Sequence, residues 1–266
     1  MNNPPESAPA VRLRAVCLSY RGTVLFEDLD VDLPAGLTTC LLGPSGVGKT
    51  SLLRLVAGLT EAGPAPTNGM VVDQQGRDVH DRVAYMAQQD LLLPWASVLG
   101  NVLLGPRLRG EHRDPGVEAR ARDLIGRVGL AGREQDFPAV LSGGMRQRVA
   151  LARTLMEDRP IVLMDEPFSG LDAITRFVLQ ELAAHLLDGR TVLLVTHDPL
   201  EALRLGHRVY VMAGRPARLE SALGEAPDAD GLAPPPRDPA DSDVLARQAD
   251  LLKRLAKARQ EGLEGP

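Results

Sequence analysis

One glycine-rich stretch constrains the fold more than any other part of this sequence. It reads Gly43-Pro44-Ser45-Gly46-Val47-Gly48-Lys49-Thr50 and fits the phosphate-loop pattern GxxxxGK[ST]. An apolar run over residues 37–42 precedes it, and a helix-like segment over residues 49–57 follows, with Gly58 as its stop. Buried apolar runs of this kind are typical of parallel sheets, so the context predicts an α/β fold.

The residue types in this loop suit a polyphosphate. Glycines let successive backbone N–H groups converge on phosphate oxygens, and the positive end of the following helix faces the same anion. We expect Lys49 to reach the β- and γ-phosphates and the Thr50 hydroxyl to ligate Mg²⁺. A chance match is the alternative, but Lys49 is the only lysine before Lys253 in a chain that otherwise uses arginine. The predicted nucleotide-binding residues here are Gly43, Pro44, Ser45, Gly46, Val47, Gly48, Lys49, Thr50 and Ser51.

Short apolar runs alternate with helix-like segments along the rest of the chain, which favours a largely parallel sheet. Between residues 90 and 159 the pattern is helical, and a helical block between strands of one sheet indicates an inserted subdomain. Strands are predicted over residues 11–18, 23–33, 161–164, 191–196 and 209–212, and the clearest inserted helices over 117–128 and 146–156.

Both ends of the chain differ in composition from its middle. Residues 1–10 are polar and proline-rich, without the features of a signal peptide, and are predicted to be a disordered tail before a domain at 11–220. Residues 221–243 are rich in Pro, Ala and Asp and are predicted to be an extended linker. A final helix is expected over 244–262, capped by Asp241 or Ser242. Its predicted inner stripe is Leu245, Ala249, Leu252 and Ala256, with Leu251 and Leu255 beside it.

Charge and cysteine content narrow the functional class. The net charge of −5 and the pI near 5.6 lend no support to nucleic-acid binding. Cys17 and Cys40 lie in apolar stretches and are expected to be reduced core thiols of a cytosolic protein. No apolar run approaches the ~18 residues that a membrane span needs, so any membrane part would be another chain.

Two carboxylates follow the apolar run over residues 161–164. At the carboxyl end of a central strand, where ligands bind in such sheets, Asp165 would hold Mg²⁺ and Glu166 would polarise an attacking water as general base. The alternative is an ordinary strand end. The occurrence of the Asp165-Glu166 pair and the glycine-rich loop in one predicted sheet favours the catalytic interpretation.

Two further residues fit the same chemistry. His197 follows an apolar strand and could contact the γ-phosphate, although a lone histidine there is more often structural. Gln88 follows the short apolar segment at residues 85–87, and its amide could sense Mg²⁺ and the water. Taken alone, Gln88 would be an unremarkable polar residue.

A second anion-binding device lies at Leu141-Ser142-Gly143-Gly144-Met145, which opens a helix whose inner stripe contains Val149, Ala152 and Leu155. With this segment the chain closely resembles the ATPase subunits of ABC transporters, over nearly all of residues 11–215. The resemblance implies a P-loop NTPase fold: a RecA-like parallel-sheet core, an N-terminal antiparallel β portion and an inserted helical subdomain at about residues 90–159.

The family resemblance also implies the role of each matching position. Glu166, His197, Gln88 and Lys49 would act in catalysis, and Thr50, Gln88 and Asp165 at the metal. Tyr20 would stack on adenine, the alternative being a half-buried strand tyrosine. Ser142, Gly143 and Gly144 would bind nucleotide, as would Asp172 at the end of Ser169-Gly170-Leu171-Asp172. Met145 and Gly170 depart from the commonest family residues, Gln and Ala, but neither departure removes a chemical group with a direct role.

The resemblance further implies how such a subunit works. Two copies, predicted to be identical, would bind two ATP molecules at their shared seam, with the P-loop of one copy facing the Ser142 segment of the other. The motor would act at the cytoplasmic face of the membrane on separate permease subunits, and indirectly on a solute-binding protein. No nucleic-acid partner is expected.

Three short segments resemble those of one importer branch, which serves nitrate, sulfonate and taurine, and of importers for hydroxymethylpyrimidine: Leu93-Pro94-Trp95, Met145 and Arg237-Asp238-Pro239. Trp95 would belong to a groove that grips the permease, or alternatively to the core. Three other functions remain open: a non-transport ABC ATPase, an exporter subunit and a catalytically inactive regulatory module.

Overall fold

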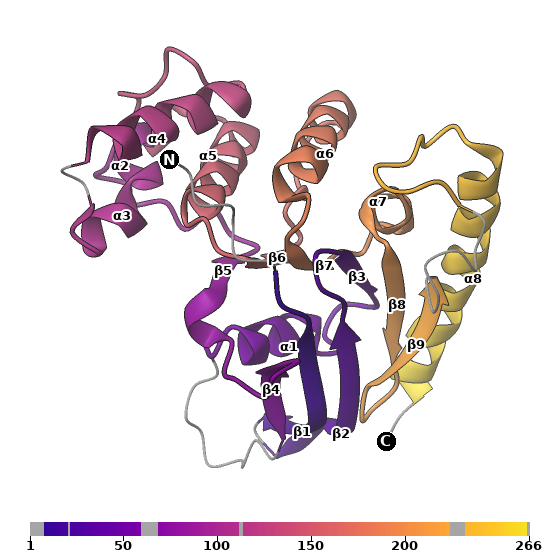
Figure 1. The fold of residues 1–266 in the computed structure, drawn as a ribbon. Coiled ribbons are helices and arrows are strands. Elements are labelled where there is room, and N and C mark those ends of the chain that lie inside the picture. The colour runs from indigo at the N-terminus through magenta and orange to yellow at the C-terminus, as the bar shows by residue number, and fades with distance from the viewer. Residues whose placement is uncertain (1–7, 21, 60–68, 112–113, 224–231, 265–266) are drawn as a thin grey trace. The chain divides into compact units, whose positions relative to one another are not determined.

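The computed structural model describes residues 8–20, 22–59, 69–111, 114–223 and 232–264, with side chains described as far as residue 260. The chain forms two compact units (Figure 1). The first contains residues 1–83, 160–165 and 187–266, and the second contains residues 84–159 and 166–186.

A small antiparallel sheet begins the first unit. Its strands are β1 (Val11–Tyr20), β2 (Thr23–Leu33) and β4 (Met70–Asp73), in the order β2-β1-β4. Both pairings are antiparallel. The predicted antiparallel N-terminal portion is therefore confirmed.

The larger sheet carries the glycine-rich loop. In the first unit its strands run in the order β6-β7-β3-β8-β9. The pairs β6–β7, β7–β3 and β3–β8 are parallel, and β8–β9 is antiparallel. β6 and β7 are buried along their whole length, as their apolar sequences predict. The bounds are β3 (Thr38–Leu42), β6 (Ile161–Asp165), β7 (Thr191–Val195), β8 (Arg208–Ala213) and β9 (Arg218–Leu223).

In the described part of the first unit, the helices α1, α7 and α8 accompany these strands. α1 (Lys49–Val56) buries Leu52, Leu53 and Val56 and packs against β6 and β7. α7 (Pro199–Leu205) begins at Asp198, whose carboxylate accepts hydrogen bonds from the first backbone amides of the helix. α8 (Ser242–Glu264) lies beside β8 and β9 in Figure 1 and also packs against α7. A short 3₁₀ helix at His80–Arg82 precedes β5.

The buried face of α8 differs from the predicted one. Val244, Leu251 and Ala258, spaced seven residues apart, are buried, whereas Leu245 and Leu252 of the predicted stripe are 49% and 52% exposed. Consecutive helical residues are about 100° apart, so the two candidate stripes lie on adjacent faces. The packing against β8 and α7 selects the face of Val244. The predicted cap is correct, because Asp241 Oδ1 accepts a 2.8 Å hydrogen bond from the amide of Asp243.

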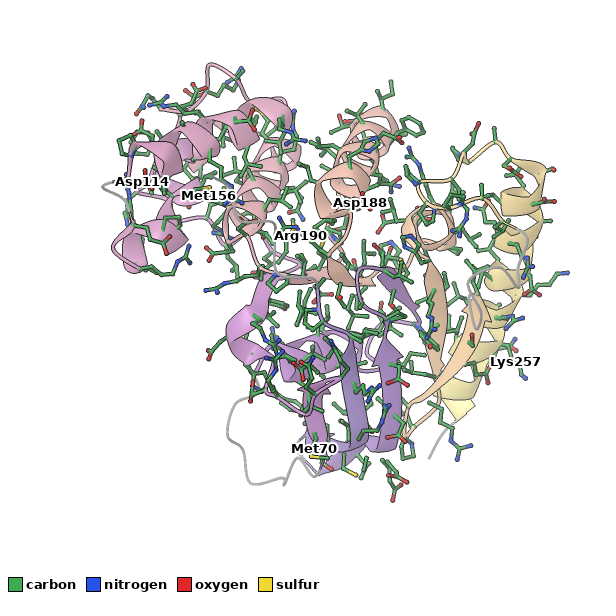
Figure 2. The ribbon with its side chains drawn as sticks, viewed as in Figure 1. Met70, Asp114, Met156, Asp188, Arg190 and Lys257 are labelled. Atoms are coloured by element: carbon green, nitrogen blue, oxygen red, sulfur yellow. The ribbon has the colours of Figure 1, made fainter. Side chains whose placement is uncertain are left out.

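The second unit is mainly helical. Its helices α2, α3 and α4 each pack against α5. Figure 2 shows Asp114 at the start of α4, where its side chain accepts a hydrogen bond from the Gly116 amide and caps the helix. The elements are β5 (Val83–Met86), which starts in the first unit, α2 (Val98–Val102), α3 (Leu104–Leu108), α4 (Pro115–Arg127), a 3₁₀ turn (Pro138–Val140), α5 (Gly143–Met156) and α6 (Ala173–Leu187).

Three boundaries differ from the sequence-based ones. In the predicted tail, Pro9 is buried and its carbonyl accepts a hydrogen bond from the Thr191 hydroxyl, so order begins before residue 11; residues 1–7 lie outside the described part. The predicted linker is shorter, because residues 221–223 complete β9 and α8 starts at Ser242; residues 224–231 lie outside the described part. The second unit also includes α6, beyond the predicted 90–159 block.

The two cysteines differ in their burial. Cys40 is fully buried, as predicted, while Cys17 is only partly buried, and both are free thiols. Over the described parts of the chain, none of the helices combines the length and the apolar character that crossing a bilayer requires.

Candidate functional site

The glycine-rich loop joins β3 to α1 and has a backbone that only glycine can follow easily. Gly43 has φ +159° and Gly48 has φ +112°. A Cβ on Gly43 would lie 2.6 Å from the carbonyl oxygen of Met212, and one on Gly48 would lie 2.9 Å from the ring of Phe26. The loop is therefore wedged between β8 and β2, which fixes its shape before any ligand binds.

Lys49 is folded over this loop. Its ammonium donates hydrogen bonds to the carbonyl oxygens of Gly43 (2.8 Å) and Pro44 (3.0 Å), and the side chain is buried. A positive charge is thus held against the loop, beside the N-terminus of α1. Backbone amides, a helix N-terminus and an ammonium together fit a phosphate group.

Two oxygen-bearing side chains, Asp165 and Thr50, lie at the end of β6 and at the start of α1. Asp165 is the last residue of β6 and is 2% exposed. Thr50 lies in the first turn of α1, which packs against β6. A hydroxyl and a carboxylate are hard ligands of the kind that Mg²⁺ accepts.

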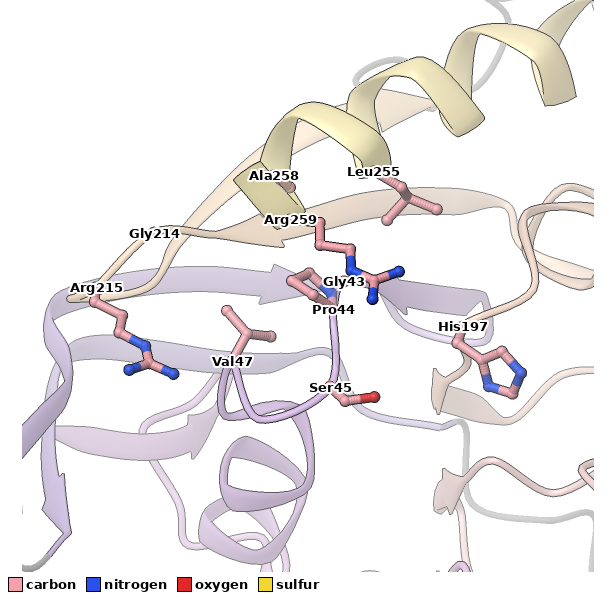
Figure 3. A pocket seen from close by; sticks show the side chains of 10 residues that line it. All are labelled: Gly43, Pro44, Ser45, Val47, His197, Gly214, Arg215, Leu255, Ala258 and Arg259. Carbon is pink, nitrogen blue, oxygen red and sulfur yellow. The ribbon is translucent and has the colours of Figure 1, made fainter. Parts of the chain in front are cut away.

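His197 lies two residues beyond the end of β7 and lines a hollow of about 460 Å³ together with Gly43, Pro44 and Ser45. Figure 3 shows these residues and, on the other side of the hollow, Arg259 of α8. The structure thus brings His197 to the phosphate loop, as predicted from its position after a strand. The participation of α8 was not foreseen.

Tyr20 ends β1 and is 60% exposed. It pairs with Thr23 at the turn of the β1–β2 hairpin, near Phe26, whose ring supports Gly48. Tyr20 is thus more exposed than the half-buried strand tyrosine of the alternative interpretation.

In the second unit, Gln88 and Glu166 meet. The Gln88 side-chain amide donates a 3.2 Å hydrogen bond to Oε2 of Glu166. Glu166 has φ +48°, an unusual conformation for a non-glycine residue, and its carbonyl oxygen accepts hydrogen bonds from the amide and hydroxyl of Ser169. The turn that Ser169 closes holds this backbone conformation.

Ser142 is exposed at the N-terminus of α5, and its hydroxyl oxygen accepts a 3.3 Å hydrogen bond from the amide of Met145. Gly144 lies close to Leu171, since a Cβ there would approach the leucine side chain to 3.2 Å. Gly143 has more room, with only the end of Arg146 near such an atom. The exposed helix start is therefore open to an anion.

Asp172 caps α6. Its carboxylate accepts a 3.0 Å hydrogen bond from the Thr175 amide, and this backbone bond, joined by the Thr175 side chain, lowers the pKa of Asp172 below its usual value. The structure therefore gives Asp172 a capping role, whatever else it contacts.

Residues 26–169, more than half of the chain, match the family model described as ABC transporter. The chain belongs to the ABC transporter family. The P-loop NTPase fold predicted from the sequence is confirmed, and so is the activity class: the chain is an ATPase.

Similar proteins of the ABC transporter family support the same assignment. The chain is 43% identical to the aliphatic sulfonates import ATP-binding protein SsuB 1 of Rhodococcus jostii (strain RHA1) over 90% of each chain. It is 44% identical to the taurine import ATP-binding protein TauB of Jannaschia sp. (strain CCS1), over 73% of this chain and 72% of that one. Among solved structures it resembles a dimeric ATP-binding cassette in a post-hydrolysis state bound to ADP and Pi, with a TM-score of 0.65 and 29% identity, over 76% of this chain and 93% of the other. The predicted resemblance to sulfonate and taurine importer ATPases is confirmed.

Two arginines of this ABC ATPase were missed by the sequence analysis. Arg146 Nε bonds Asp90 Oδ2 at 2.9 Å, while Arg153 donates to the carbonyl oxygens of Asp90 and Leu91. The two arginines are seven residues apart, hence on one face of α5. They fasten the segment after Gln88 to the helix that Ser142 opens. The seven-residue spacing of these arginines can be read from the sequence, but the segment that they bind cannot.

Proposed function

We propose that two copies of this ABC ATPase close around two MgATP molecules and so drive a separate membrane permease. The observation that carries the proposal is that one chain holds two separate anion-binding devices. One is the wedged loop with Lys49, and the other is the exposed α5 N-terminus at Ser142. One bound nucleotide needs a single phosphate loop, so a second device suggests contact with the nucleotide of a second copy.

On the loop side, Lys49 and the backbone amides of residues 43–50 bind the phosphates, and the exposed Tyr20 ring stacks on the base. Thr50 and Asp165 hold Mg²⁺, and Gln88 is the residue proposed to sense it. One or two protein oxygens suffice for Mg²⁺ when phosphates supply others, which agrees with this short donor set. When bound, the cation neutralises the charge that develops on the phosphate oxygens.

Hydrolysis is assigned to Glu166, with Gln88 and His197 assisting. Glu166 accepts the proton of the attacking water, and the hydrogen bond from Gln88 restricts the orientation of its carboxylate. His197, which lines the hollow beside the phosphate loop, orients the terminal phosphate. The contribution of the protein is mainly positioning and electrostatic stabilisation.

The proposed cellular setting is the cytoplasmic face of the membrane, as the import subunit of a sulfonate or taurine transporter. Its two named relatives are import ATP-binding proteins for these solutes. The partners would be a second identical subunit, permease subunits and, through them, a solute-binding protein.

The segment after Gln88 is the proposed contact with the permease. Trp95 is 75% exposed, so the alternative that it belongs to the core is wrong. Leu91 and Val140 of the same unit are also exposed apolar residues. Arg146 and Arg153 tie this segment to α5, which gives nucleotide binding a physical path to the permease.

The deciding experiment is the oligomeric state of a Glu166→Gln variant, measured by light scattering with and without MgATP. We expect a monomer without nucleotide and a dimer with it. Adding Ser142→Arg to the same chain should prevent the dimer while ATP binding persists. A monomer at saturating MgATP, with the permease present, would refute the proposal. If the dimer forms, the solute can be identified by co-purifying the permease with its binding protein and determining which ligand that protein carries.

A further inference from the structure

The hollow beside the phosphate loop has a second wall that the proposed ATPase mechanism does not use. This wall consists of the C-terminal helix, through Leu255, Ala258 and Arg259, and of the β8–β9 turn, through Arg215. Figure 3 shows the Arg259 guanidinium directed from α8 toward the loop at Gly43 and Pro44, with Arg215 and His197 on either side.

The described ionisable side chains that line this hollow are all basic. Two arginines and a histidine line it, and none of the described residues that line it is acidic. Within the described parts of the chain, neither Arg215 nor Arg259 forms a hydrogen bond or ion pair, although most other arginines of the chain do. Two guanidinium groups that line a hollow beside a phosphate loop, with no acidic partner among the described residues, favour an anion.

α8 is held in this position by a buried anchor at its base. The Arg237 side chain donates hydrogen bonds to the carbonyl oxygens of Ala233, Leu203 and Gly206, and its own amide bonds the Arg204 carbonyl. The carbonyls of Leu203, Arg204 and Gly206 lie at the end of α7, whose N-cap, Asp198, directly follows His197. The helix that carries Arg259 is thus fastened to the element next to His197.

We propose that Arg259 and Arg215 complete a subsite for a phosphate group, formed jointly by the glycine-rich loop, His197 and the C-terminal helix. The phosphate is either the terminal phosphate of the bound nucleotide or free inorganic phosphate released from it. The inference rests on the proposed nucleotide site and adds α8 to it. Phosphate in the hollow would contact α8 through Arg259, so the helix would interact directly with the phosphate of the nucleotide or with the phosphate released from it.

The test measures ligand affinity in the full-length Glu166→Gln protein by calorimetry at low ionic strength, with and without Arg259→Gln. Arg259 is exposed and is not part of the fold's core. If the subsite takes the nucleotide's own phosphate, affinity for ATP falls about fivefold and affinity for ADP is unchanged. If it takes free phosphate, affinity for ATP is unchanged and the ADP-loaded protein binds inorganic phosphate about fivefold more weakly. Either result supports the subsite and identifies its source.

Two control variants separate charge at the hollow from charge on the helix. Arg259→Lys keeps the cation and should retain affinity within about twofold. Arg254→Gln removes a cation that pairs with Asp250 on the same helix and does not line the hollow, and it should change nothing. The inference is wrong if Arg259→Gln alters neither affinity, or if Arg254→Gln alters them equally. A Lys49→Ala protein that still binds ATP normally would instead overturn the nucleotide site itself.

Discussion

The amide of Gln88 and the carboxylate of Glu166 are joined by a 3.2 Å hydrogen bond. Gln88 follows β5, and Glu166 follows β6, so residues far apart in sequence meet at one point. Since the Gln88 nitrogen donates and the Glu166 oxygen accepts, the bond restricts the orientation of the side chain proposed as general base. The relationship gives both residues a testable role.

Glu166→Gln should bind ATP and hydrolyse it at least ~100-fold more slowly, because an amide cannot accept the proton of water. The amide oxygen can still accept the bond from Gln88, so the site geometry should persist. Phosphate release under single-turnover conditions measures the effect. Glu181→Gln on α6 removes a carboxylate elsewhere in the same unit and should hydrolyse at the wild-type rate. Equal turnover in both variants would remove Glu166 from its role.

Gln88→Ala should lower kcat about tenfold while leaving ATP affinity nearly unchanged, since the Glu166 carboxylate loses one positioning contact. The two residues act as a unit, so Gln88→Ala should cost much less in a Glu166→Gln background. A double-mutant cycle on kcat tests this. Fully additive losses would contradict the coupling.

Gly48→Ala should destabilise the fold by about 3 kcal/mol, because a Cβ would enter the ring of Phe26 at an unfavourable backbone conformation. Gly46→Ala also has a positive φ, but nothing lies within 4 Å of its Cβ, so about 1 kcal/mol is expected. Denaturant unfolding compares the two variants. Similar costs at the two glycines would show that the Phe26 contact is unimportant.

Trp95→Ala should uncouple transport from hydrolysis. The side chain is 75% exposed, so its loss should leave folding and basal ATPase intact while weakening the grip on the permease. Solute uptake and ATPase activity, measured on the same reconstituted complex, provide the readout. Leu252→Ala, an exposed apolar residue of α8, serves as the control. Parallel loss of both activities in Trp95→Ala would refute the coupling role.

Arg237→Met should lower the free energy of unfolding by about 3 kcal/mol, because three carbonyl oxygens lose a charged donor in a buried setting. Arg254→Met removes an exposed arginine and should cost less than about 0.5 kcal/mol. Thermal or urea unfolding of both variants measures the difference. An equal, small effect would mean that Arg237 is not the anchor of α8.

The phosphate loop, the strand before Asp165 and helix α5 were predicted from sequence because each combines a local motif with a buried apolar run. The face of α8 could not be predicted in this way. Leu245 and Val244 lie on adjacent faces of one helix, and only the packing against β8 and α7 distinguishes them. The bond between Gln88 and Glu166 depends on strand pairing, and the place of Arg259 depends on the path of the whole C-terminal segment. Such long-range relationships leave no local signal.

The Arg237 anchor also limits how this chain can be shortened. A version ending after β9, at residue 223, would keep the phosphate loop, the Ser142 segment and every residue proposed for catalysis. It would nevertheless leave the Leu203 and Gly206 carbonyls without their charged donor and uncover the surface that Val244, Leu251 and Ala258 occupy. The segment beyond the motifs is thus structural support for α7, and engineered fusions should attach their partners after α8.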